Sequence, residues 1–246
     1  MQHRSKKIKK SFFIILVVLI VLSGGSAIYL GNYYHSVDVE KYMNSSSEVS
    51  VEKFDKGWFF DGAGEEKALI FYPGAKVATE AYAPLMYQLA ESGIDCFLVD
   101  MPFHMAFFGM NRAEEIMQEY NYEAWYLGGH SLGGAMAANF AADYVEDHTD
   151  GIRGLLLLAA YPTKDLSTSD MSVVTVYGSE DGVLNMDKIV AGRELMPQDY
   201  KEVCIEGGNH AQFGSYGTQK GDGTAAIPAE EQWARTVEVF VGDESE

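Results

Sequence analysis

The chain has 246 residues, of which 47% are apolar and 22% are charged. This is the balance of an ordinary globular protein, and the length suffices for one large core. Lysine and arginine number 18 against 36 aspartates and glutamates, so the formal net charge is −18. Such an acidic chain excludes nucleic acid as an expected partner, because binding to phosphate backbones requires basic patches. The sequence contains no metal-binding or phosphate-loop motif, so we expect neither a metal nor a cofactor.

The N-terminal segment has the pattern of a membrane anchor. Residues 1–10 are basic and contain no acid, and residues 11–30 carry no charge and are mostly apolar. About 20 such residues span a bilayer, and flanking positive charges stay cytoplasmic. We therefore expect residues 1–10 inside the cell, a transmembrane helix over 11–30, and a single-pass protein of the cell membrane whose main domain lies outside.

A cleaved signal peptide is the alternative for the same segment. Its strongest apolar stretch, 12–22, has the length of a signal-peptide core, and Gly25-Ser26-Ala27 is a suitable cleavage site. The domain would then be secreted. Either pattern predicts export, with residues 31–47 as a polar tether and 48–246 as one domain.

The domain itself alternates between strands and helices. In chain order the patterns predict a hairpin of strands at 49–54 and 57–60, a strand at 67–74, a helix at 82–91, a strand at 94–102, a helix at 113–120, a strand at 123–129, a helix at 132–145, strands at 154–160 and 172–178, a helix at 186–195, a strand at 200–208 and a helix at 231–241. Continuous apolar strands between helices predict an α/β fold with a mostly parallel sheet of about eight strands, covered on both faces.

Two irregular segments bear on access to a site in this fold. The gap between Ala160 and Ser172 is short, so any lid there is small. The Gly-rich segment from Ala211 to Pro228 is longer, and it is a second candidate for covering the site.

Gly129-His130-Ser131-Leu132-Gly133 matches the G-x-S-x-G pattern of a nucleophile elbow. The motif follows a predicted strand and opens a predicted helix, which is the setting that the elbow requires. Its glycines let the strand and the helix pass closely around a strained serine. We therefore predict Ser131 as the nucleophile.

A serine nucleophile needs a base and an acid, which follow it in this fold in the order acid, then histidine. Asp181 follows the predicted strand 172–178, and Glu180 beside it is the rival acid. His210 follows the last predicted strand. Both positions lie at carboxyl ends of strands, where open α/β sheets bind ligands. The predicted triad is Ser131, Asp181 and His210.

An oxyanion hole requires two N–H donors. One should be the backbone N–H of Leu132, the residue after the nucleophile. The other should come from the loop after the strand 67–74; we predict the N–H of Ala75, with that of Gly74 as the rival. Substrate-binding residues cannot be assigned from these patterns.

The remaining reactive residue types are predicted to have structural roles. His130 is the variable position of the elbow, and His104 is a loop histidine after the strand 94–102. Asp222, between two glycines, suits a turn better than an ion site. Cys96 and Cys204 each lie in a predicted buried strand, so we expect two inert core thiols.

Four short motifs together resemble the α/β-hydrolase superfamily over roughly residues 65–241: Gly-His-Ser-Leu-Gly-Gly at 129–134, Tyr-Pro-Gly-Ala-Lys-Val at 72–77, Tyr-Gly-Ser-Glu-Asp-Gly-Val at 177–183 and Gly-Gly-Asn-His at 207–210. The stretch 210–223 is similar to a small bacterial branch related to dienelactone hydrolases. The resemblance implies an α/β-hydrolase fold, for which the short gap after Ala160 predicts a minimal lid, and a serine acyl hydrolase without a metal or organic cofactor. The dienelactone hydrolases themselves use cysteine as nucleophile, so their substrate is not carried over to Ser131.

These observations predict a hydrolase that cleaves a small-molecule acyl ester through an acyl-enzyme on Ser131. A peptidase or an acyltransferase would use the same triad and differ only in the leaving group or the acceptor. A non-catalytic binding module on the same scaffold is the third alternative, since a fold does not determine a function.

Overall fold

The computed structural model describes residues 31–148 and 151–243. The predicted basic terminus 1–10 and the predicted membrane segment 11–30 lie outside these residues. Within the described ranges, no helix is long and apolar enough to cross a membrane. Residues from Tyr34 onward form one compact unit.

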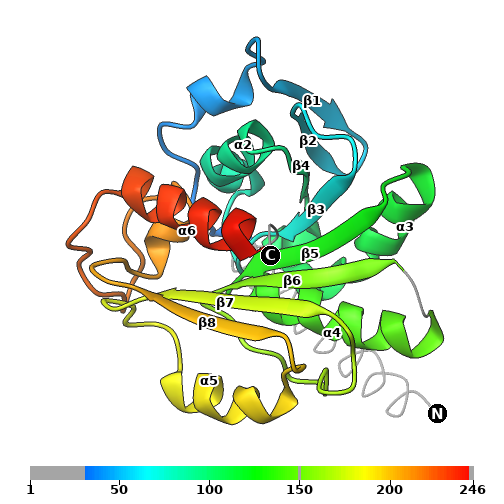
Figure 1. Ribbon diagram of the computed structural model, residues 1–246. Helices are drawn as coiled ribbons and strands as arrows, with labels where there is room; N and C mark the ends of the chain where they lie inside the picture. Colours follow the sequence, from blue (N-terminus) through cyan, green and yellow to red (C-terminus); the bar gives the residue numbers. More distant parts are fainter. Residues whose placement is uncertain (1–30, 149–150, 244–246) are drawn as a thin grey trace, which may run out of the picture. The chain divides into compact units, whose positions relative to one another are not determined.

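One sheet of eight strands runs through this unit, in the order β1-β2-β4-β3-β5-β6-β7-β8 (Figure 1). The pairings β1–β2 and β2–β4 are antiparallel and all the others are parallel, which confirms the predicted mostly parallel sheet. The strands are β1 (Ser50–Phe54), β2 (Gly57–Asp61), β3 (Lys67–Tyr72), β4 (Asp95–Val99), β5 (Ala124–His130), β6 (Ile152–Leu158), β7 (Ser172–Gly178) and β8 (Tyr200–Ile205).

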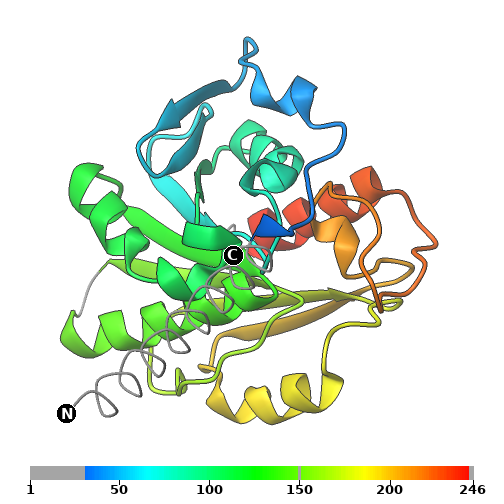
Figure 2. The same ribbon diagram turned by 180° about the vertical axis from the view of Figure 1, so that it is seen from behind.

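Helices cover both faces of the sheet. Helices α2 and α6 pack against each other on one face, and α3 and α4 lie on the other (Figures 1 and 2). Part of the predicted helix 186–195 is a 3-10 turn, Arg193–Leu195, which follows α5. The α-helices are α2 (Ala83–Glu91), α3 (Arg112–Glu119), α4 (Leu132–Asp147), α5 (Met186–Gly192) and α6 (Ala229–Asp243).

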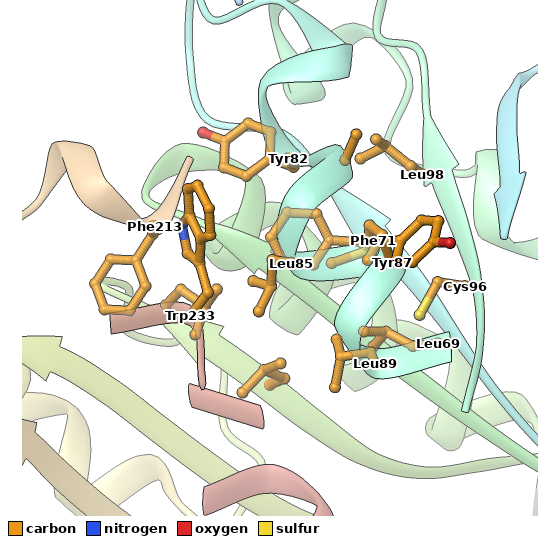
Figure 3. Close-up of a cluster of buried hydrophobic side chains, with 14 of the residues drawn as sticks. Leu69, Phe71, Tyr82, Leu85, Tyr87, Leu89, Cys96, Leu98, Phe213 and Trp233 are labelled. Carbon is orange, nitrogen blue, oxygen red and sulfur yellow. The ribbon is translucent and has the colours of Figure 1, made fainter. Parts of the chain in front are cut away.

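The central strands read as continuous apolar runs because both of their faces are buried. In β3, Leu69 and Phe71 face the cluster under α2 and α6, whereas Ile70 and Tyr72 face the cluster under α4. Figure 3 shows the first cluster, in which side chains of α2 fill the space between the sheet and Trp233 of α6. This double-sided core fixes the carboxyl ends of β3, β5, β7 and β8, from which the predicted site residues emerge.

From Tyr34 onward, the predicted tether 31–47 is part of the domain rather than a segment apart from it. Tyr34 forms a parallel bridge with Val77, and its N–H donates to the carbonyl of Lys76 at 2.7 Å. Val39 is buried, and a 3-10 turn follows at Glu40–Met43. The difference arises because this segment, polar by composition, finds backbone partners in a loop that is distant in sequence.

One of the two cysteines departs from the prediction. Cys96, in the centre of the sheet, is buried, but Cys204 is exposed. Cys204 belongs to β8, which is an edge strand. The expectation of two core thiols was wrong because an apolar strand pattern does not reveal whether the strand lies inside the sheet or at its edge.

Candidate active site

Ser131 occupies a strained one-residue turn between β5 and α4. Its φ of 53° and ψ of −120° lie outside the regions that non-glycine residues ordinarily adopt. Its N–H donates to the carbonyl of Leu158 at 2.9 Å, and its own carbonyl accepts the N–H of Ala135 at 3.1 Å. These bonds hold the serine at the N-terminus of α4, as an elbow requires.

The elbow depends on Gly133 for close backbone approach. A Cβ at this position would lie 2.1 Å from the carbonyl oxygen of Tyr72 and 2.4 Å from that of Pro73. Both contacts are with backbone, so neither can be relieved by rotating a side chain. The glycine therefore allows α4 to start directly beside the end of β3.

We expect Gly133→Ala to lower the free energy of unfolding by about 3 kcal/mol, because the strand and the helix must separate. Gly192→Ala is the matched control: its Cβ would meet Pro162 at an ordinary 3.4 Å, and its backbone is helical. We expect a change of no more than about 1 kcal/mol there. Urea denaturation of both variants provides the measurement. Equal stabilities of the two variants would contradict this account of the elbow.

Asp181 and His210 form a buried pair. The Asp181 Oδ2 lies 2.8 Å from the His210 Nδ1, and the two side chains are only 3% and 2% exposed. The other carboxylate oxygen, Oδ1, accepts the N–H groups of Val183 and Leu184 at 2.8 and 2.7 Å. The carboxylate is thus fully engaged and holds the imidazole in one orientation. The rival acid Glu180 is exposed and its carboxylate instead contacts Ser179.

The second ring nitrogen of His210 is available for chemistry. Its Nε2 is buried and has no hydrogen-bond partner among the described residues. His210 and Ser131 both line one cavity of about 360 Å³. The structure therefore brings the three predicted triad residues together. Asp181 contacts His210, and His210 and Ser131 line the same cavity.

Most of this cavity is apolar. No residue of the 211–228 segment lines it, whereas Tyr161 and Thr163 of the short segment after β6 do. A larger cavity, of about 680 Å³, lies near Gly64 and Gly93 at the opposite end of β3 and contains none of the triad residues. We take the smaller cavity as the site because of its chemistry. Its lining residues are Ser131, Leu132, Ala135, Met136, Ala159, Ala160, Tyr161, Thr163, Val183, Leu184, Asn185 and His210.

The loop after β3 distinguishes between the two predicted oxyanion donors. The N–H of Gly74 donates to the hydroxyl of Tyr82 at 3.0 Å, so this donor is already engaged. Leu132, the other predicted donor, lines the cavity as the first residue of α4. Ala75 remains the predicted second donor from this loop, although it does not line the cavity.

His130 supports the site from behind. Its Nδ1 lies 2.8 Å from the Tyr82 hydroxyl, and its ring centroid lies 4.4 Å from that of His210. Burial, and next the neighbouring His210, hold the pKa of His130 well below its ordinary value of 6.5. A neutral His130 thus connects the loop after β3, through Tyr82, with His210. This agrees with the predicted structural role.

The depressed pKa makes His130 a source of acid lability. In the unfolded chain His130 binds a proton near pH 6.5, whereas in the folded protein it stays neutral at that pH. The free energy of unfolding therefore falls as the pH drops below that value. We expect His130→Gln to reduce this slope by up to about 1.4 kcal/mol per pH unit. Urea denaturation between about pH 5.5 and 7.5 tests it. The exposed His148→Gln is the control and should leave the slope unchanged; an unchanged slope in both variants would contradict the assignment.

Asp222 has a larger role than the predicted turn. Its carboxylate accepts the N–H groups of His210 and Ala211 at 3.2 and 2.8 Å, and that of Gly182 at 3.1 Å. It therefore joins the loop of the histidine to the loop of the acid. The only signal in the sequence is the pair of flanking glycines, which does not reveal contacts with residues so distant along the chain.

The described residues contain no group of three or more His, Cys, Asp or Glu side chains that could hold a metal ion. The cavity is lined by a serine in an elbow and by the histidine of a histidine–carboxylate pair.

The fold has many relatives among solved structures. A carboxyl esterase from the mycorrhizal fungus Tuber melanosporum is 13% identical, with a TM-score of 0.60 over 85% of this chain and 89% of its own. A putative hydrolase from Agrobacterium vitis S4 is 13% identical, with a TM-score of 0.58 over 79% and 98%. A monoacylglycerol lipase from Paleococcus ferrophilus is 14% identical, with a TM-score of 0.57 over 80% and 99%. At these identities the likeness shows the fold alone.

A comparison with curated protein sequences finds no match. The finer resemblance to dienelactone hydrolases is not confirmed by any of these comparisons. The profile of the family described as "Alpha/beta hydrolase family" matches residues 68–234, which is more than half of the chain and contains all three predicted triad residues. The chain therefore belongs to the alpha/beta hydrolase family.

Proposed function

We propose that this protein is a serine hydrolase that cleaves acyl esters through Ser131, His210 and Asp181. The observation that carries the proposal is the buried Asp181–His210 pair, whose Nε2 is unpaired among the described residues, on the same cavity as a serine in an elbow. Hydrolase relatives with esterase and lipase names support the reaction class.

In the proposed reaction, His210 Nε2 accepts the proton of the Ser131 hydroxyl as its oxygen attacks the ester carbonyl. Asp181 stabilises the imidazolium that forms. The N–H groups of Leu132 and Ala75 stabilise the negative charge on the carbonyl oxygen. His210 then protonates the departing alkoxide, which leaves an acyl group on Ser131. Water, deprotonated by His210, attacks this acyl-enzyme, and the acid leaves as His210 returns that proton to the Ser131 oxygen.

The apolar wall of the cavity suits the acyl part of the substrate. Burying methylene groups against Leu132, Met136 and Leu184 stabilises a bound acyl chain by about 0.8 kcal/mol for each CH₂. The volume of about 360 Å³ is at the small end for ligand pockets, which favours a short acyl group or one part of a longer chain.

The proposed activity is tested with a fluorophosphonate probe, which reacts with activated serines. We expect the protein to be labelled and Ser131→Ala to be unlabelled, because Ser131 is the one serine in the described part of the chain that lines the cavity with His210. Ser215, which lies outside the cavity, is the matched control, and Ser215→Ala should label like the unsubstituted protein. Absence of labelling in the folded protein would contradict the proposed function.

For the location, we propose that residues 11–30 anchor the protein in the cell membrane with the hydrolase domain outside. The support is the uncharged stretch that follows a one-sided basic run. Alkaline extraction of membranes, together with sequencing of the mature N-terminus, tests this. An intact N-terminus in the extracted pellet is expected. A terminus near Ala27 in the soluble fraction would instead indicate a cleaved signal.

A further inference from the structure

Three phenylalanines form an exposed cluster in the loop that follows β4. Phe103, Phe107 and Phe108 are 59%, 67% and 55% exposed. The centroid of the Phe108 ring lies 5.7 Å from that of Phe103 and 5.6 Å from that of Phe107. Phe103 has a φ of 57°, a conformation that is unfavourable for a bulky residue and persists only where the surroundings impose it. A contiguous aromatic patch of this kind marks an interaction surface.

The phenylalanine cluster is joined to two elements that carry the candidate active site, although Phe107 and Phe108 themselves line a separate cavity of about 310 Å³ together with Arg112 and Glu115. We call the surface formed by the cluster's loop and the loop 72–77 the active-site rim. The carbonyl of His104, within the cluster's loop, accepts the N–H of Lys76, the residue after the predicted oxyanion donor Ala75. The 3-10 turn Ala106–Phe108 contacts α4, the helix that begins after Ser131. The cluster is therefore attached to both the oxyanion loop and the nucleophile helix.

The chain enters the domain at the same rim. The N–H of Tyr34 donates to the carbonyl of Lys76 at 2.7 Å, and its carbonyl accepts the N–H of Ala78 at 2.8 Å. Lys76 thus bonds to the entering chain through its carbonyl and to the cluster's loop through its N–H. The course of the entering residues can be followed in Figure 2, where they are dark blue.

The three segments that meet at Lys76 lack acidic residues, although the chain has 36 of them. Residues 31–37, 67–79 and 101–113 contain no aspartate or glutamate, and they include Lys76 and Arg112. An acidic domain is repelled by anionic membrane surfaces. The phenylalanine cluster thus lies on segments that carry no acid of their own, although Glu80, Asp100 and Glu115 flank them, and this lowers the repulsion locally.

We propose that the phenylalanine cluster inserts into the surface of a lipid bilayer, so that the active-site rim faces the membrane and the substrate is an amphipathic lipid ester. This rests on the proposed hydrolase function and on the proposed anchor. The uncharged run 11–30 ends four residues before Tyr34. Four residues span at most about 14 Å, so an anchor in that run would hold Tyr34, and with it the adjoining Lys76, close to the membrane surface. Aromatic side chains partition favourably into that interfacial region.

Fluorescence quenching tests the contact without depending on catalysis. The full chain carrying Phe107→Trp is placed in phosphatidylcholine vesicles that contain brominated phosphatidylcholine, and the signal of the unsubstituted chain is subtracted. The control is Val190→Trp on α5, because Val190 is 52% exposed and lies outside the three acid-free segments. We expect at least about threefold stronger quenching at position 107 than at 190. Equal quenching, or none at 107, overturns the proposal.

Activity in the same vesicles tests the substrate class. The triple variant Phe103→Ser, Phe107→Ser, Phe108→Ser should hydrolyse a bilayer-embedded long-chain acyl ester about 10-fold more slowly, while kcat/KM for a soluble short-chain ester stays within about twofold. The control, Met186→Ser with Val190→Ser, removes two exposed apolar side chains of α5 and should change neither rate. Equal losses on both esters overturn the lipid-ester assignment. Quenching at position 107 without fluorophosphonate labelling at Ser131 would instead show that the surface is correct and the proposed hydrolase function is not.

Discussion

Replacing His210 with alanine is expected to lower kcat for an acyl ester by about six orders of magnitude, as removal of the base does in other serine hydrolases. The Ser131 hydroxyl is a poor nucleophile without a base. In this protein two carboxylates fix the position of the proposed base, His210. The Asp181 Oδ2 lies 2.8 Å from its Nδ1, and Asp222 accepts its backbone N–H. No other histidine lines the cavity, so nothing among the described residues can replace it.

The measurement is kcat for a soluble ester with His210→Ala, Ser131→Ala and the double variant. Because the two residues act as one unit, the double variant should be about as slow as either single variant. His148→Ala is the control, since His148 is exposed and does not line the cavity; its kcat should stay within about twofold. Losses that multiply in the double variant would show that the serine and the histidine act independently, against the proposed mechanism.

Replacing Asp181 with asparagine should lower kcat by about four orders of magnitude. In the proposed mechanism His210 Nδ1 donates its hydrogen to Asp181 Oδ2, 2.8 Å away, and Nε2 takes the serine proton. An amide nitrogen in that place donates instead, so the histidine adopts the wrong tautomer. The oxygen of asparagine can still accept the N–H groups of Val183 and Leu184. The loop should therefore keep its shape while activity is lost.

Glu180→Gln is the matched control for this variant, because it removes the neighbouring carboxylate by the same chemical change. Glu180 is exposed and does not line the cavity, so we expect kcat to change by no more than about twofold. Circular dichroism and urea denaturation of both variants establish that they are folded. A large loss in Glu180→Gln with little loss in Asp181→Asn would reassign the acid.

Local patterns were enough to predict a mostly parallel sheet and the succession of strands and helices along the chain. The unbroken apolar runs at 67–74 and 123–129 correspond to β3 and β5, which helices bury on both faces. The elbow pattern correctly places a turn at Ser131 because each of its requirements is local: a strand before, a helix after, and glycines at the close approaches. Periodicity and glycine spacing report the near neighbours of a residue along the chain, and these features depend on such neighbours.

What the sequence by itself determined was therefore the fold class, the elbow and a short list of acid, base and oxyanion residues. Only the tertiary structure distinguished between the candidate residues on that list. Asp181 rather than Glu180 contacts His210, and the N–H of Gly74 is bonded to the hydroxyl of Tyr82. The link from Asp222 to the histidine loop, the exposure of Cys204 at a sheet edge and the docking of Tyr34 on Lys76 were likewise inaccessible to sequence patterns. Each depends on contacts between residues far apart in the chain, and such contacts leave no periodic trace in the sequence.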